Sequence, residues 1–183
     1  MSKPSQVIVL LEDDHHKMLI YRYLKKHGLG HEIRIELPPP GRGSAESWVR
    51  NRFDKEVSAY RLRQRKAKTA LIVVIDADAH SVQDRWKQLD QALKDAEKLP
   101  VDIEHEKIAR VVPKRNIETW ILCLTKQTVD EETDYRNTRN DWNELIPTAA
   151  ATLFQWTRQE AELPNHCIDS LRTGIKELSR LAL

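Results

Sequence analysis

The sequence has few cysteines and no long apolar run. Its 183 residues include two cysteines, Cys123 and Cys167, which lie far apart and form no CxxC pair. Neither a disulfide framework nor a zinc knuckle is therefore indicated, which fits a reducing compartment. No apolar stretch approaches the roughly 20 residues that span a bilayer, and the first residues, MSKPSQ, lack the apolar core of a signal peptide. We therefore expect a soluble cytoplasmic protein with no membrane partner.

Repeats and nucleotide-binding signatures are also missing. The chain has no internal repeat and no Walker motif. Its net charge is only +2, which by itself neither requires nor excludes a nucleic-acid partner. The length fits one domain with a substantial core. The order of apolar and charged residues along the chain is therefore more informative than their totals.

What is present is an alternation of β-rich apolar runs with amphipathic segments. The apolar runs predict strands at 7–11, 31–37, 70–75 and 108–112. Helical spacing predicts helices at 17–26, 44–66, 82–98, 117–124, 142–159 and 167–181. Strands that alternate with helices imply a mainly parallel sheet covered on both faces. We therefore expect an α/β fold with a four-stranded sheet over residues 1–125, and a helical extension, residues 126–183, packed on the same domain.

Charged residues follow three of the predicted strands. Those within a few residues of a strand end are Glu12, Asp13, Asp14, Asp76, Asp78, Lys114 and Glu118. Because ligands of open α/β sheets bind outside the carboxyl ends of the strands, we expect these side chains to gather at one edge. Hard carboxylate oxygens suit Mg²⁺ or Mn²⁺, which keep waters for a substrate phosphate. The predicted chemistry is phosphoryl transfer or phosphodiester hydrolysis.

An acid after a strand has a second interpretation, because Asp commonly caps a helix that follows. For Asp14, which precedes a predicted helix, we favour the cap. Asp76 and Asp78 differ, since two carboxylates at the end of so apolar a strand repel each other unless a cation lies between them. We therefore interpret Asp76 and Asp78 as metal ligands.

The opening motif resembles one known family of signalling proteins. The segment VIVLLEDDHHKMLIYRYLKKHG, residues 7–28, is similar to the first strand and helix of a response-regulator receiver domain. Such domains hold magnesium with paired acids and are phosphorylated on an aspartate after the third strand, which here would be Asp76. The rest of the chain departs from that pattern, because a long basic helix precedes the third strand and Lys114 follows the fourth strand rather than a fifth.

A second resemblance covers residues 7–124. A Glu after the first strand, an Asp-x-Asp after the third and a Glu in a later helix resemble the Toprim domain of topoisomerases, primases and nucleases of the overcoming-lysogenization-defect group. The matching residues are Glu12, Asp76, Asp78 and Glu118. The form IETW around Glu118 is similar to small stand-alone Toprim-like proteins of prokaryotic phage-defence loci. The chain departs from the family at Asp13, where Gly is usual, and at His16, where an acid is frequent.

The Toprim resemblance implies a nuclease that cleaves DNA or RNA with Mg²⁺ or Mn²⁺, in anti-phage defence and with a separate ATPase as a partner. Glu12 would bind metal or act as general base, Asp76 and Asp78 would bind metal, and Glu118 would complete the site. Lys114 would stabilise charge on the transferring phosphate. Because of the departures, a catalytically silent Toprim-like subunit that binds nucleic acid or a partner stays an alternative.

Basic residues and histidines complete the candidate set. The predicted contacts to nucleic-acid phosphates are Arg42, Arg50, Arg61, Arg63, Arg65 and Lys66. Such contacts would give salt-dependent affinity that does not depend on sequence, although a charge-rich helix is equally consistent with a solvated face. His15, His16 and His80 lie beside the acids. A histidine next to a hydrolytic metal can bind it or move a proton, whereas exposed loop histidines are common.

Overall fold

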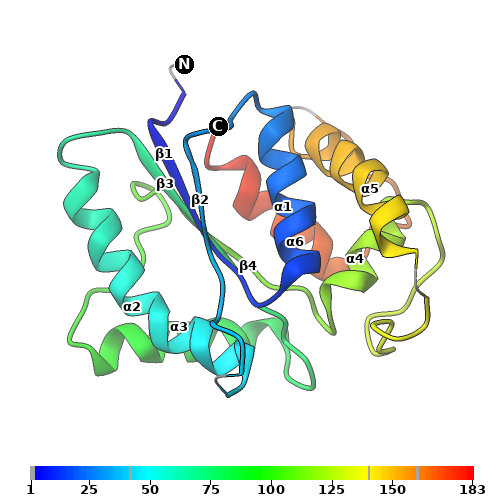
Figure 1. Ribbon diagram of the computed structural model, residues 1–183, viewed down its shortest axis with the longest axis horizontal. Coiled ribbons are helices and arrows are strands. Elements are labelled where there is room, and N and C mark those ends of the chain that lie inside the picture. Colours follow the sequence, from blue (N-terminus) through cyan, green and yellow to red (C-terminus); the bar gives the residue numbers. More distant parts are fainter. Residues whose placement is uncertain (1–2, 42, 140, 160) are drawn as a thin grey trace.

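A computed structural model describes residues 3–41, 43–139, 141–159 and 161–183 (Figure 1). The described residues form one four-stranded sheet in the order β2-β1-β3-β4, in which every pairing is parallel. Its strands are β1 (Gln6–Leu10), β2 (Ile33–Glu36), β3 (Thr69–Val74) and β4 (Ile108–Val111). The expected α/β fold with a parallel four-stranded sheet is therefore confirmed.

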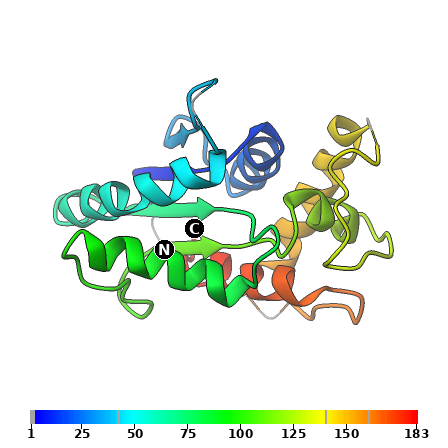
Figure 2. The same ribbon diagram turned by 90° about the horizontal axis from the view of Figure 1, so that it is seen from below.

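Helices cover both faces of this sheet. The helices are α1 (Asp14–Lys26), α2 (Ala45–Arg63), α3 (Val82–Asp95), α4 (Ile117–Leu124), α5 (Trp142–Trp156) and α6 (Asp169–Ser179). One face carries α2 and α3, and the other carries α1, α4, α5 and α6 (Figures 1 and 2). In the described ranges, no helix is both long and apolar enough to cross a membrane.

The burial of the strands follows from their place in the sheet. All six residues of β3 are buried, because β1 and β4 flank it and helices cover both faces. Alternate residues of β1 face opposite cores: Val7 and Val9 pack with α1, and Ile8 and Leu10 pack with α2. β2 lies at an edge and is half-buried throughout. The most apolar predicted strand is thus the central one.

The carboxyl-terminal helices pack on the face that carries α1. α5 packs against α1 and α4, and α6 packs against β4. Every residue of α4 is buried, including Trp120, whose indole Nε1 donates to Ser170 Oγ at 2.8 Å. α6 approaches this indole closely, since a Cβ added to Gly174 would lie 2.1 Å from Trp120 Cη2. This packing fixes the position of α4, whose first turn carries Glu118.

Candidate metal centre

The two central strands end at a topological switch point. β1 and β3 are neighbours, but α1 covers one face of the sheet and α3 covers the other. In parallel sheets this divergence opens a crevice at the carboxyl ends of the strands, where ligands bind. Glu12 follows β1 into this crevice and Asp76 follows β3. The Asp76 backbone N–H donates to Glu12 Oε1 at 2.5 Å, which ties the two strand ends together.

A buried histidine joins the two acids. His16 lies in the first turn of α1, with its Nε2 3.0 Å from Asp76 Oδ1 and its Nδ1 2.8 Å from Asp13 Oδ1. The side chain of His16 is fully buried. Ligand atoms of Glu12, His16 and Asp76 all lie within 4.8 Å of one another. Two carboxylates and one imidazole therefore meet at the switch point.

The predicted helix cap is wrong by one residue. Asp13, not Asp14, is the N-cap of α1, because its side chain accepts from the His16 backbone N–H at 3.1 Å. Asp14 is the first residue of the helix and is exposed, with Lys17 Nζ 3.4 Å from its carboxylate. α1 begins earlier than its apolar spacing predicts, and the cap moves with the helix start. Asp13 therefore fixes both the start of α1 and the orientation of the His16 ring.

Glu118 lies beside this cluster. Asn116 caps α4, so Glu118 falls in the first turn and faces back toward the strand ends. Its Oε1 lies 2.6 Å from His15 Nδ1, and its charge contributes to raising the pKa of Asp76. Within the described part of the chain, its Oε2 is buried and bonds to no side chain or backbone group. A buried carboxylate oxygen without a donor is costly, and a cation would satisfy it.

Asp78 sits on the open side of the site. Its backbone is left-handed, with φ of 53°, and its side chain is 38% exposed. Arg136 Nη2 lies 2.6 Å from Asp78 Oδ1 and 3.5 Å from Asp76 Oδ2. Arg85, which is almost fully buried on α3, donates from Nε to the Asp76 carbonyl at 2.9 Å and also pairs with Glu46. Two arginines thus hold the turn that carries both aspartates.

Neither arginine is among the site residues that the sequence predicts. Arg85 carries a usable signal, because it is in helical phase with Val82 and Leu89 on the buried face of α3. A charged residue on an apolar stripe must find a buried partner. Arg136 carries no such signal, since it lies in a polar loop, 58 residues from Asp78.

Burial sets the protonation of the cluster. Burial, reinforced by the charge of Asp76, raises the pKa of Glu12 to about 8. Burial also raises the pKa of Asp76, although the charge of His16 opposes it. Burial acts to lower the pKa of His16, but the charge of Asp76 and the hydrogen bond with Asp13 outweigh it and hold that pKa well above its usual range. The pKa values of all three groups are therefore raised, which favours their protonated forms.

The donor set fits a divalent cation. Carboxylate oxygens suit Mg²⁺ and Mn²⁺, and an imidazole nitrogen favours Mn²⁺ or another transition metal. Glu12 and Asp76 would supply buried ligand atoms, His16 would join them only in its deprotonated form, and Asp78 and Glu118 lie next to them. The unpartnered Glu118 Oε2 is a further buried oxygen that a cation would satisfy.

Two further predicted residues have other neighbours. Lys114 forms an ion pair with Glu132 at 3.1 Å, in the loop between α4 and α5. Its ammonium would have to leave this partner to reach a phosphate. His80 is exposed, and it lies at the far end of the turn that carries Asp78. The histidine whose ring nitrogen lies among the carboxylate oxygens of Glu12 and Asp76 is His16.

The predicted nucleic-acid contacts are mostly remote from the acids. α2 begins at the carboxyl edge of the sheet and its 19 residues span about 28 Å, so its last residues lie at the amino edge. Arg50 pairs with Glu46, and Arg61 pairs with Glu106 and donates to the carbonyls of Leu99 and Pro100. The remaining predicted contacts at the end of α2 are Arg63, Arg65 and Lys66. Arg42 lies outside the described residues.

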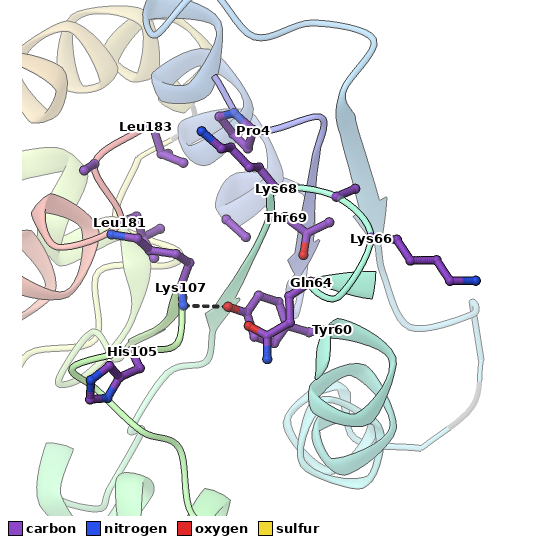
Figure 3. Close-up of a pocket in the computed structure, with 13 residues that line it drawn as sticks. Pro4, Tyr60, Gln64, Lys66, Lys68, Thr69, His105, Lys107, Leu181 and Leu183 are labelled. Atoms are coloured by element: carbon purple, nitrogen blue, oxygen red, sulfur yellow. Dashed lines mark hydrogen bonds between the residues drawn. The ribbon is translucent and has the colours of Figure 1, made fainter. Parts of the chain in front are cut away.

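A hollow of about 580 Å³ lies at this amino edge (Figure 3). It is lined by residues at the starts of β3 and β4, by the end of α2 and by the last residues of the chain. Its lining includes Lys66, Lys68, Lys107 and His105, and none of the side chains that line it in the described part of the chain is acidic. The Tyr60 hydroxyl accepts from the Lys107 backbone N–H at 2.7 Å across its floor. The lining of this hollow is therefore basic, whereas the carboxyl edge of the sheet holds the cluster of acids.

Comparisons of the chain with protein-family models, with curated proteins and with solved structures give no match.

Proposed function

We propose that this protein is a divalent-metal-dependent nuclease that hydrolyses phosphodiester bonds in DNA or RNA. The observation that carries the proposal is the buried group of Glu12, His16 and Asp76 at the switch point of the sheet. Glu118 and Asp78 adjoin this group, so the four acids of the Toprim resemblance lie at one edge. The resemblance is what suggests a role in prokaryotic defence and an ATPase partner.

The residues of the site have separable roles in such a reaction. A divalent cation held there would neutralise charge on the phosphate and lower the pKa of a bound water. Asp76 and Asp78 would hold the cation, and His16 orients the Asp76 carboxylate through its 3.0 Å contact. Burial raises the pKa of Glu12 to about 8 in the metal-free protein, so its carboxylate is a stronger base than an exposed one. Glu12 therefore suits either binding the cation or accepting a proton from water.

A receiver domain is supported less well by the same geometry. The phosphoryl acceptor would be Asp76, whose side chain is 2% exposed and whose two oxygens contact His16 and Arg136. A phosphoryl donor reaches this carboxylate only after those contacts break. Labelling of Asp76 by acetyl phosphate would nevertheless overturn the nuclease proposal in favour of signalling.

The test compares cleavage by the protein and by a variant without one ligand. Plasmid, single-stranded DNA and RNA are incubated with the full chain in Mn²⁺ or Mg²⁺, with and without the products of neighbouring genes. We expect cleavage that falls by about 100-fold or more in Asp76→Asn, because the variant removes a charged ligand. Asp95→Asn is the matched control, since Asp95 is exposed and bonds only Gln91 among the described contacts.

Two outcomes would contradict the proposal. Cleavage that survives in Asp76→Asn would come from a contaminant or from another site. Absence of cleavage in every condition, with Mn²⁺ bound at Asp76, would favour the silent Toprim-like subunit.

A further inference from the structure

The loop between α4 and α5 is bonded to residues near the acidic edge of the sheet. Its residues 126–139 are described and lie at the same end of the molecule as the carboxyl ends of the strands (Figure 1). Glu132 pairs with Lys114, and Asp134 Oδ1 accepts from Asn116 Nδ2 at 2.7 Å. Glu131 accepts from the Ser170 backbone N–H at 3.0 Å. Acidic residues of the loop thus anchor it to the segment that carries Glu118 and to α6.

Arg136 is the basic residue that this loop directs into the site. Its guanidinium bridges Asp78, at 2.6 Å, and Asp76, at 3.5 Å. The Asp76 side chain is 2% exposed whereas that of Arg136 is 42% exposed, so the guanidinium closes the open side of the acid pair. Arg136 therefore neutralises the two carboxylates, which would otherwise repel each other.

We propose that Arg136 is a substrate-binding residue that exchanges partners, an inference that rests on the proposed nuclease function. In the metal-free protein it bonds the aspartates. Once a divalent cation takes those carboxylates, repulsion between like charges releases the guanidinium toward solvent. Arg136 then stands beside the cation and bonds a phosphate oxygen of the substrate, because its planar donors match phosphate geometry.

The anchors of the loop make this exchange a local movement. The contacts of Glu131, Glu132 and Asp134 do not involve the site aspartates. They stay in place when Arg136 leaves Asp76 and Asp78, so the side chain moves and the loop does not. The released guanidinium is therefore kept within reach of the site.

This exchange predicts two effects of opposite sign in one variant. Arg136 competes with the cation, so Arg136→Gln should bind Mn²⁺ more tightly than the unaltered chain. Arg136 also holds the phosphate, so the same variant should bind nucleic acid more weakly. A purely structural role for Arg136 would weaken both.

The experiment measures both affinities on the full chain. Mn²⁺ binding is followed by electron paramagnetic resonance, and a short labelled single strand is titrated by fluorescence anisotropy in Ca²⁺. For Arg136→Gln we expect Mn²⁺ affinity to rise by about 10-fold and oligonucleotide affinity to fall by about 10-fold, since each change corresponds to one ion pair. The affinities of Arg136→Lys, which keeps the charge, should lie between those of the unaltered chain and those of Arg136→Gln in both assays.

The control is Arg139→Gln in the same loop. Arg139 pairs with Asp141 at 2.6 Å and contacts no aspartate of the site among the described residues, so both affinities should be unchanged. The inference is overturned if Arg136→Gln binds Mn²⁺ no more tightly, or the strand no more weakly, than the unaltered chain. A different outcome would contradict the metal centre itself: the unaltered chain binds no Mn²⁺, or Asp76→Asn binds Mn²⁺ equally well. In that case the nuclease proposal and the role of Arg136 are both wrong.

Discussion

At the carboxyl edge of the sheet the charged side chains are mostly buried and touch one another, whereas at the amino edge they are exposed and surround a hollow. His16 illustrates the first arrangement, with a fully buried ring between Asp13 and Asp76. His105 illustrates the second, with an exposed ring 2.9 Å from Asp102. Both histidines have a raised pKa, so the sign of the shift does not separate the two edges. Burial separates the two edges, because a buried charge that loses its partner destabilises the fold far more than an exposed charge does.

The difference follows from the topology of the sheet. At the carboxyl edge the chain turns from β1 into α1 on one face and from β3 toward α3 on the other, so short connections enclose the acids. At the amino edge the charged residues that line the hollow, such as Lys66, His105 and Lys107, are exposed. The buried acids at the carboxyl edge therefore need nearby cationic groups to compensate their charge. The exposed basic residues at the amino edge are compensated by solvent.

The largest effect on stability is expected from His16→Ala. Removing the imidazole leaves Asp13 and Asp76 without the group that joins them, with Asp76 buried. We expect the free energy of unfolding, measured by urea denaturation in a chelator, to fall by about 3 kcal/mol. His105→Ala removes the equivalent exposed pair and should leave the unfolding midpoint nearly unchanged. Equal effects of the two variants would abolish the contrast between the edges.

Much of this contrast is accessible from the sequence. The apolar runs locate each strand to within a few residues, and parallel topology then requires Glu12 and Asp76 to lie at one edge. Local patterns do not identify Arg136 as a compensating cation, because it meets Asp78 from 58 residues away. The same limit applies to the basic helix. A count of its arginines does not reveal that Arg61 is paired with Glu106, 45 residues along the chain.

A smaller effect of opposite sign is expected from Glu12→Gln. The pKa of Glu12 is about 8 in the folded protein and 4.5 in its ordinary state, so between these values the folded protein holds a proton that the unfolded chain has released. Stability of the metal-free protein therefore falls as the pH rises through this interval. The Gln side chain keeps an acceptor for the Asp76 N–H but carries no charge. At about pH 8.5 in a chelator, we expect Glu12→Gln to raise the free energy of unfolding by roughly 2 kcal/mol.

Two measurements test whether the buried charge of Glu12 is what destabilises the unaltered chain. The advantage of Glu12→Gln should shrink as the pH falls toward about 5, because Glu12 is then protonated in the folded protein. It should also disappear at saturating Mn²⁺, since the unaltered carboxylate then gains a cation. A stabilisation that is the same at both pH values would show that packing, not charge, distinguishes the two side chains.

The smallest effect is expected at the amino edge, from a variant with both Arg65→Gln and Lys66→Gln. These residues are exposed, so the substitutions should not alter stability, and any effect should appear in nucleic-acid affinity. If both contact phosphates, affinity falls by a few fold and the slope of log affinity against log salt decreases by about 1 to 2. Lys25→Gln with Lys26→Gln removes the same charge from an exposed pair at the end of α1, which separates a specific contact from the loss of net charge. Equal slopes in the two double variants would mean that the end of α2 is a solvated face, and that nucleic acid is held at the carboxyl edge alone.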